Sequence, residues 1–172
     1  SFKMGQVSDS VVVQTAAAPV EPSAQAKAVA GLLASQGYAV STSGRNVLSV
    51  ADNIDGNAVS IVVLISESGD EISFTCHVGN LNDIPEDQIA AQRDFCFVLC
   101  NMNDVIAPFA TSFITSEDDA TVANGNVNVV LISRSNLNHS NAAETEQMLR
   151  YQMGALRKAV VYYNQQNASM SN

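Results

Sequence analysis

The cysteines and histidines are the residues of this 172-residue chain whose chemistry could define a site. Cys96 and Cys100 are four residues apart, a spacing that puts both thiols on one side of a helix, as a pair of metal ligands requires. A structural zinc site needs two further ligands, and Cys76 with His77 is the available pair. Neighbouring residues of a strand point to opposite faces, so Cys76 and His77 would not converge. Core packing, a common role of free cysteines, is therefore favoured over metal binding.

The two histidines, His77 and His139, fall on the polar face of an expected strand and in an expected loop. A Cys–His nucleophile pair needs hydrogen-bond contact and donors for an oxyanion, and solvated histidines supply neither. The oxygen-rich turn Asp52–Asn57 is similar to a calcium loop. Aligning its glycine with the invariant glycine of such a loop puts apolar residues at the first and last ligand positions. We therefore expect no catalytic, cofactor-binding or metal-ligating residue.

The charge balance limits the class of partner. Seventeen acidic and eight basic residues give a net charge of −9. Binding to phosphate needs a concentrated basic surface, so nucleic acid and anionic membrane are not expected as partners. Three acidic clusters fall at the ends of expected elements: Glu67–Glu71, Asp83–Asp87 and Glu117–Asp119. They would form either a solvated rim or a docking surface for a basic partner. The basic residues are scattered, apart from three near the C-terminus: Arg150, Arg157 and Lys158.

Cysteine usage and hydropathy indicate the compartment. Three cysteines, an odd number, do not make a disulfide framework, and no apolar run reaches the length of a membrane span. No secretory signal is visible, although a cleaved one would leave no trace. We therefore expect a protein of the cytoplasm, where thiols stay reduced.

The first half of the chain predicts a helix followed by strands. Residues 1–22 form a flexible or extended N-terminal arm, whose first four residues we interpret as a cloning remnant. A helix from Ser23 to Gln36 follows and ends at Gly37. The apolar period then changes to two, which predicts a three-strand antiparallel meander over Tyr38–Val78. Its strand segments are Tyr38–Thr42 and Asn46–Ala51, joined by a hairpin turn, then Val59–Ile65 and Ile72–Val78.

The second half predicts two strands and a long helix. The strands cover Phe109–Thr115 and Val127–Arg134, and their turn lies at Glu117–Asp119 or at Asn124–Asn126. The last helix begins at Asn141, which forms a capping pair with Glu144. Residues 23–166 thus make a single α+β domain, and residues 167–172 a disordered tail. The order is helix, three-strand antiparallel meander, helix, two strands, helix, with the helices largely on one face of the sheet.

The stretch Asp83–Ile106 divides the two groups of strands, and we expect the fold to be organised around it. Asp83 and Glu86 match a capping box. From Phe95 to Cys100 six successive residues are apolar, and at 3.6 residues per turn they cover the whole circumference of a helix. The chain's own sheet can cover one side; a terminal helix, a second copy or a ligand must cover the other. The residues assigned to a dimer or partner surface are Phe95, Phe97, Val98 and Met102.

This order of elements, over residues 23–36, 38–78, 83–106, 109–134 and 141–163, resembles the type III secretion chaperone-like fold. Within that fold it is similar to the YbjN-type sensory-transduction regulators. The resemblance is one of topology, size and acidity, and no motif carries a residue's role across. It implies a small, acidic, usually dimeric protein without catalytic residues, whose sheet or helix surfaces hold another polypeptide.

The sequence therefore predicts a non-enzymatic protein-binding or regulatory, chaperone-like module without cofactors. It would act as a homodimer and bind a protein or peptide on its sheet or along its last helix. An alternative is a small-molecule-binding protein or an enzyme, with a pocket between sheet and helices that uses His77 or Cys76. A third possibility is a subunit of a larger assembly, tethered by the N-terminal arm.

Overall fold

The structure is a computed structural model, and it describes residues 20–81, 84–85, 87–115 and 127–170. Within these ranges three helices and six strands form one α+β domain, as the sequence predicts. Most of the N-terminal arm expected at residues 1–22 lies outside the described residues. So do both candidate turns between the last two strands, at 117–119 and 124–126.

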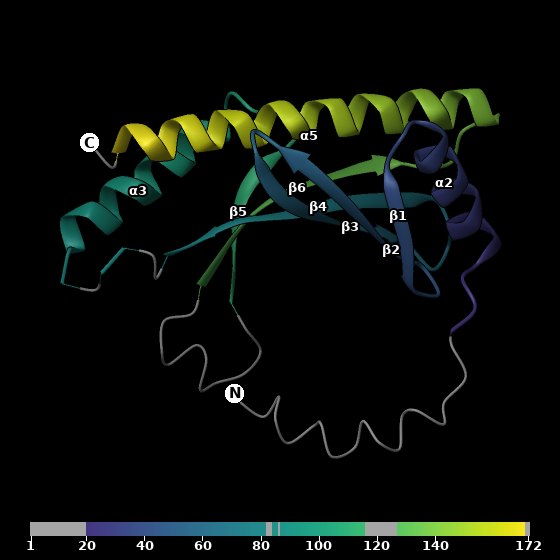
Figure 1. The fold of residues 1–172 in the computed structure, drawn as a ribbon, viewed down its shortest axis with the longest axis horizontal. Helices are drawn as coiled ribbons and strands as arrows, with labels where there is room; N and C mark the ends of the chain where they lie inside the picture. Colours follow the sequence, from purple (N-terminus) through teal and green to yellow (C-terminus); the bar gives the residue numbers. More distant parts are fainter. Residues whose placement is uncertain (1–19, 82–83, 86, 116–126, 171–172) are drawn as a thin grey trace, which may run out of the picture.

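The sheet is antiparallel, with strand order β1-β2-β3-β4-β6-β5 (Figure 1). Its strands are β1 Ala39–Gly44, β2 Val47–Ile54, β3 Asn57–Ile65, β4 Glu71–Asn80, β5 Ala110–Thr115 and β6 Val127–Asn136. The meander before the central helix has four strands instead of three, because each arm of its first hairpin is a full strand. Asp55 and Gly56 link β2 to β3 with φ values of 56° and 82°. These left-handed values fit an Asp-Gly two-residue hairpin turn. The turn expected over Asp52–Asn57 is therefore confined to Asp55 and Gly56, because β2 extends to Ile54 and β3 begins at Asn57.

Three helices lie along one face of the sheet: α2 Ala24–Ser35, α3 Ile89–Met102 and α5 Ala142–Met170 (Figure 1). Ser23 caps α2, since its hydroxyl accepts a hydrogen bond from the Ala26 N–H at 3.1 Å. The Asn141 side chain likewise accepts from the Glu144 N–H at 3.0 Å at the start of α5. Both caps are as predicted. In the part of the chain that the structure describes, no helix is long and apolar enough to cross a bilayer.

The last helix continues further than the sequence pattern indicates. A disordered tail was expected at residues 167–172, yet α5 runs to Met170. The apolar stripe stops near Tyr163, which is why the pattern ends there. Adding a residue to an existing helix needs only one more backbone hydrogen bond, so polar residues can extend it without an apolar face.

The central helix begins at Ile89, six residues later than the predicted start at Asp83, and it ends at Met102 instead of Ile106. Ile84 precedes Pro85, and a residue before proline disfavours helical backbone angles. Gln88 occupies the N-cap position without a side-chain cap. The Gln92 side chain instead donates to the Ile84 carbonyl at 3.0 Å and so holds the preceding segment against the first turns of α3.

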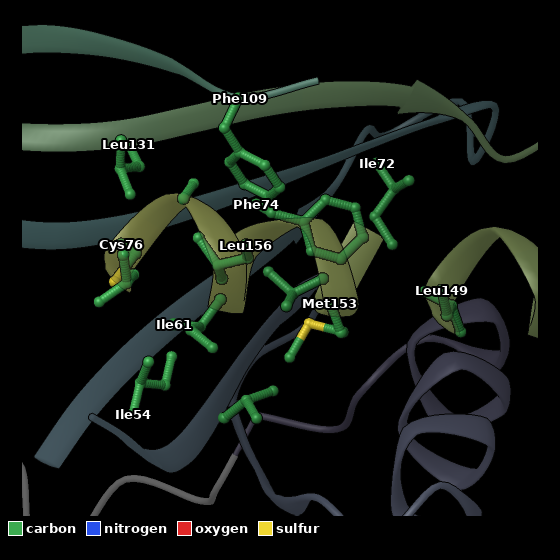
Figure 2. Close-up of a cluster of buried hydrophobic side chains, with 14 of the residues drawn as sticks. Ile54, Ile61, Ile72, Phe74, Cys76, Phe109, Leu131, Leu149, Met153 and Leu156 are labelled. Carbon is green, nitrogen blue, oxygen red and sulfur yellow. The ribbon is translucent and has the colours of Figure 1, made fainter. Parts of the chain in front are cut away.

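The core lies between the helices and one face of the sheet. In β4, Phe74 and Cys76 are buried while His77 is exposed, the alternation that the sequence predicts. Figure 2 shows side chains from β2, β3, β4 and β6 meeting those of α5, among them Phe74, Ile61, Leu131, Met153 and Leu156. No described helix covers the other face of the sheet, and Leu64 of β3 is 42% exposed there. The strand Asn57–Ile65 is thus interior in the sheet order and buries one face, with Ile61 and Val63 in the core.

A buried polar pair joins β6 to α5. The Ser133 hydroxyl donates to the Gln152 side-chain oxygen at 2.9 Å, and both residues are buried. We expect Ser133→Ala to lower the free energy of unfolding by about 1–3 kcal/mol, because the Gln152 oxygen is left without this donor. In the double variant with Gln152→Met much of that loss should return, which urea unfolding of the two variants would measure. Equal stability of the single and double variants would contradict the buried hydrogen bond between Ser133 and Gln152.

Candidate functional site

The thiol and imidazole groups near the centre of the chain do not converge. Cys76 lies in the core, where burial raises the pKa of its thiol to about 11. His77 is on the other, exposed face of β4. Cys96 is half-buried and Cys100 exposed on α3. Among the described residues no group of three or more His, Cys, Asp and Glu side chains is placed to hold a metal ion.

His139 lies in the segment before α5, beside a hollow of about 620 Å³ that Glu144 and Arg150 also line. Its Nε2 atom is buried and makes no hydrogen bond within the described chain. The Ser140 hydroxyl and backbone N–H both donate to the Glu144 carboxylate, and these bonds hold the pKa of Glu144 below its ordinary value. Glu144 therefore acts as a charged capping group of α5.

The apolar block Phe95–Cys100 is divided between two sides of α3. Phe95 and Met102 are buried in the chain's own core, and the Phe95 ring meets that of Tyr163 edge to face at 6.5 Å between centroids. Val98 is half-buried. Of the four residues assigned to a partner surface, Phe95 and Met102 therefore belong to the core, because α5 covers this side of α3. The sequence pattern could not show which side α5 takes.

The opposite side of α3 carries large apolar groups in contact with solvent. Phe97 is 70% exposed and Ile89 is 72% exposed. Cys96, Cys100 and Arg93 lie on the same side, and we call these five residues the outer face of α3. At about 100° per residue, Ile89 and Phe97 are about 80° apart around the helix axis, so they can contact one partner together.

A second feature is a hollow of about 460 Å³ between α5 and the segment that follows α3. Val105 and Ile106 line one side of it, and Tyr151, Gly154, Lys158 and Tyr162 of α5 line the other. We call this hollow the α5 groove. It lies on the solvent side of α5 and not between sheet and helices, and neither Cys76 nor His77 lines it. The α5 groove is therefore a different hollow from the pocket between sheet and helices that the sequence predicts, and that pocket stays a prediction.

The three clustered basic residues of α5 differ in their partners. Arg157 forms an ion pair with Asp52, which joins α5 to β2. Arg150 forms an ion pair with Glu146 at 3.1 Å, one turn earlier in the helix. Lys158 has no ion-pair partner in the described part of the chain, and it lines the α5 groove. The clustering was visible in the sequence, but which cation remains unpaired depends on the fold.

The acidic cluster Glu67–Glu71 has a structural role in the turn between β3 and β4. The hydroxyls of Ser66 and Ser68 donate to the Asp70 carboxylate, and these bonds lower the pKa of Asp70 from its ordinary value. The clusters at 83–87 and 117–119 lie partly or wholly outside the described residues.

Comparison with known proteins gives a fold-level likeness at most. No family model matches the chain, and no curated protein matches it significantly. Among solved structures, the chain is similar to the crystal structure of an uncharacterized protein from Methanothermobacter thermautotrophicus. It is 10% identical, with a TM-score of 0.47, over 83% of this chain and 98% of that chain. The resemblance to secretion chaperones and YbjN-type regulators therefore stays a prediction.

Proposed function

We propose that this chain is a non-enzymatic protein-binding or regulatory module, chaperone-like in kind, which works as a homodimer joined through the outer face of α3. The observation that carries the proposal is the exposure of Phe97 and Ile89 on one side of this helix. Exposed apolar groups that gather on one element are typical of contact sites. A free thiol at the exposed Cys100 supports the cytoplasm as the compartment, because such thiols persist where conditions are reducing.

The expected strength of the dimer follows from what it buries. An isologous contact uses the same surface on both copies, so each copy contributes Phe97 and Ile89. Burying one such side chain fully contributes about 1.5–3 kcal/mol. The free energy from burying four such side chains is of the same order as the cost of association, about 4–15 kcal/mol. The dimer should therefore dissociate on dilution, which leaves the same face available to a protein or peptide partner.

We expect Phe97→Asp to convert the dimer to a monomer, because a charge in the centre of the contact would have to be desolvated. The wild-type protein should sediment at twice 18.2 kDa at high concentration, and the variant at 18.2 kDa. Phe97 is exposed, so the far-ultraviolet circular dichroism of the variant should equal that of the wild type. Sedimentation equilibrium over a range of concentrations measures both masses.

Phe113→Asp is the matched control, since Phe113 is also exposed but lies on β5. Phe113→Asp should leave the dimer intact. The conservative variant Phe97→Leu keeps an apolar side chain in the contact and should largely retain the dimer that Phe97→Asp loses. A folded Phe97→Asp protein that still dimerises would overturn the proposed contact. A wild-type protein that is monomeric at every concentration would overturn the homodimer itself.

A second candidate function is favoured by the α5 groove. Its volume of about 460 Å³ is within the range of small-molecule sites, about 300–1,000 Å³. A small-molecule-binding protein would use this hollow, which mixes apolar, tyrosine and cationic side chains. This candidate does not require the dimer.

A further inference from the structure

Lys158 is the starting point, because it is a cation on an acidic protein and forms no ion pair with any residue that the structure describes. The chain has eight basic residues and a net charge of −9. Arg150 and Arg157 are each neutralised by a carboxylate, those of Glu146 and Asp52. Lys158 has no such carboxylate among the described residues, and it lines the α5 groove. A cation left unpaired beside a hollow favours an anionic ligand.

The middle of the α5 groove is kept open by a glycine. Gly154 lies in the interior of a 29-residue helix, where glycine destabilises relative to alanine. A Cβ built at this position would meet no atom within 4 Å, so close packing inside the chain does not require the glycine. Its missing side chain leaves space next to the small Ala155, and both residues line the groove.

The remaining lining combines apolar side chains with two tyrosines and Arg150, and the groove is of limited length. Val105 and Ile106, from the segment after α3, face α5 across the groove, and Ala159 adds to its apolar lining. From Lys158 back to Tyr151, helix α5 rises about 10 Å. This length and lining suit an acyl chain of medium length better than a folded polypeptide.

We propose that the α5 groove binds a small amphipathic anion, a carboxylate with a medium-length apolar chain. The carboxylate lies at Lys158, and the apolar chain runs over Gly154 and Ala155 toward Ile106 and Tyr151. Arg150, which Glu146 already neutralises, contributes less to affinity than Lys158. This inference names the ligand class for the second candidate function and is independent of the α3 dimer.

Octanoate is the probe and octanol its uncharged counterpart, each titrated into the ¹⁵N-labelled full chain and followed by amide chemical shifts. We expect octanoate to shift the amides of residues 105–107 and 150–162, and octanol to bind more weakly. Lys158→Met, which keeps the apolar stem, should weaken octanoate about fivefold, as an ion pair on a partly exposed surface contributes. Lys27→Met on α2 is the matched control and should leave the affinity unchanged.

A second pair of variants tests the shape of the groove. Gly154→Leu fills the space over the helix and should weaken octanoate by more than about tenfold. Gly31→Leu makes the same change in α2, where a Cβ also meets nothing within 4 Å, and should leave binding unchanged.

The outcomes separate the two levels of the inference. Octanol that binds in the groove as tightly as octanoate would overturn the anionic class but leave a small-molecule site. Shifts confined to another part of the chain, or no shifts at all, would overturn both. Groove amides that change with protein concentration before any octanoate is added would mean that a second copy occupies the groove, which also overturns the inference.

Discussion

Phe74→Ala should lower the free energy of unfolding by about 3–5 kcal/mol, the cost of removing a large aromatic side chain from a closed core. Phe74 is fully buried in β4, where α5 covers it. Strands on both sides fix its position, through Val63 of β3 and Ser133 of β6. Because the neighbouring strands are tied by backbone hydrogen bonds, the cavity can collapse only partly. Urea unfolding followed by circular dichroism, with m-values compared, measures the loss.

His77→Ala is the matched control for Phe74→Ala. His77 is on the same strand but is exposed on the opposite face of the sheet, so its replacement should change stability by no more than about 0.5 kcal/mol. A loss below about 1 kcal/mol for Phe74→Ala would contradict the position of its ring in the core. The variant and its control must be measured at the same protein concentration, since the apparent stability of a dimer rises with concentration.

The buried thiol of Cys76 should make the protein less stable at alkaline pH. Burial raises the pKa of Cys76 from its ordinary value of 9.0 to about 11 in the folded chain. Between these values the unfolded chain loses the thiol proton while the folded chain keeps it. The folded state then binds more protons, so stability falls as pH rises, by about 1.4 kcal/mol per unit and about 2–3 kcal/mol in total. Below pH 9 this contribution is fully present.

The variant Cys76→Ala should lack this part of the pH dependence. It will be less stable than the wild type at neutral pH because it leaves a small cavity. The difference between the two proteins should shrink as pH rises from 9 to 11. Cys100→Ala, at an exposed thiol, should follow the wild-type profile. Parallel profiles for the wild type and Cys76→Ala in urea unfolding at each pH would show that Cys76 is not shielded as the structure indicates.

Local rules in the sequence were sufficient for much of the fold. Alternation in β4 put Cys76 and His77 on opposite faces, with Cys76 buried and His77 exposed, because successive side chains of a strand must point to opposite faces. Ser23 and Asn141 marked the starts of two helices, since each can satisfy a backbone N–H that the first turn leaves free. The oxygen-rich segment Asp52–Asn57 indicated a turn, which the structure confines to Asp55 and Gly56.

Features that depend on neighbouring elements were not visible in the sequence. The start of α3 was misplaced, because Asp83 and Glu86 match a capping box whereas Ile84, just before Pro85, disfavours helical angles. The strand count of the meander was one too low, although all of its segments had been recognised. The α5 groove was not predicted from the sequence, because it forms between α5 and the segment after α3, which are far apart in the chain.

By itself the sequence determined the class of fold, most of its elements and the fact that the block Phe95–Cys100 would be apolar on every side. Only the tertiary structure decided that Phe95 packs under α5 while Phe97 stays exposed, because burial depends on which side a distant helix covers. It also decided that Lys158, beside the α5 groove, has no ion-pair partner within the described ranges. Glu146, one turn earlier in α5, neutralises Arg150. Asp52 neutralises Arg157 because α5 packs on β2.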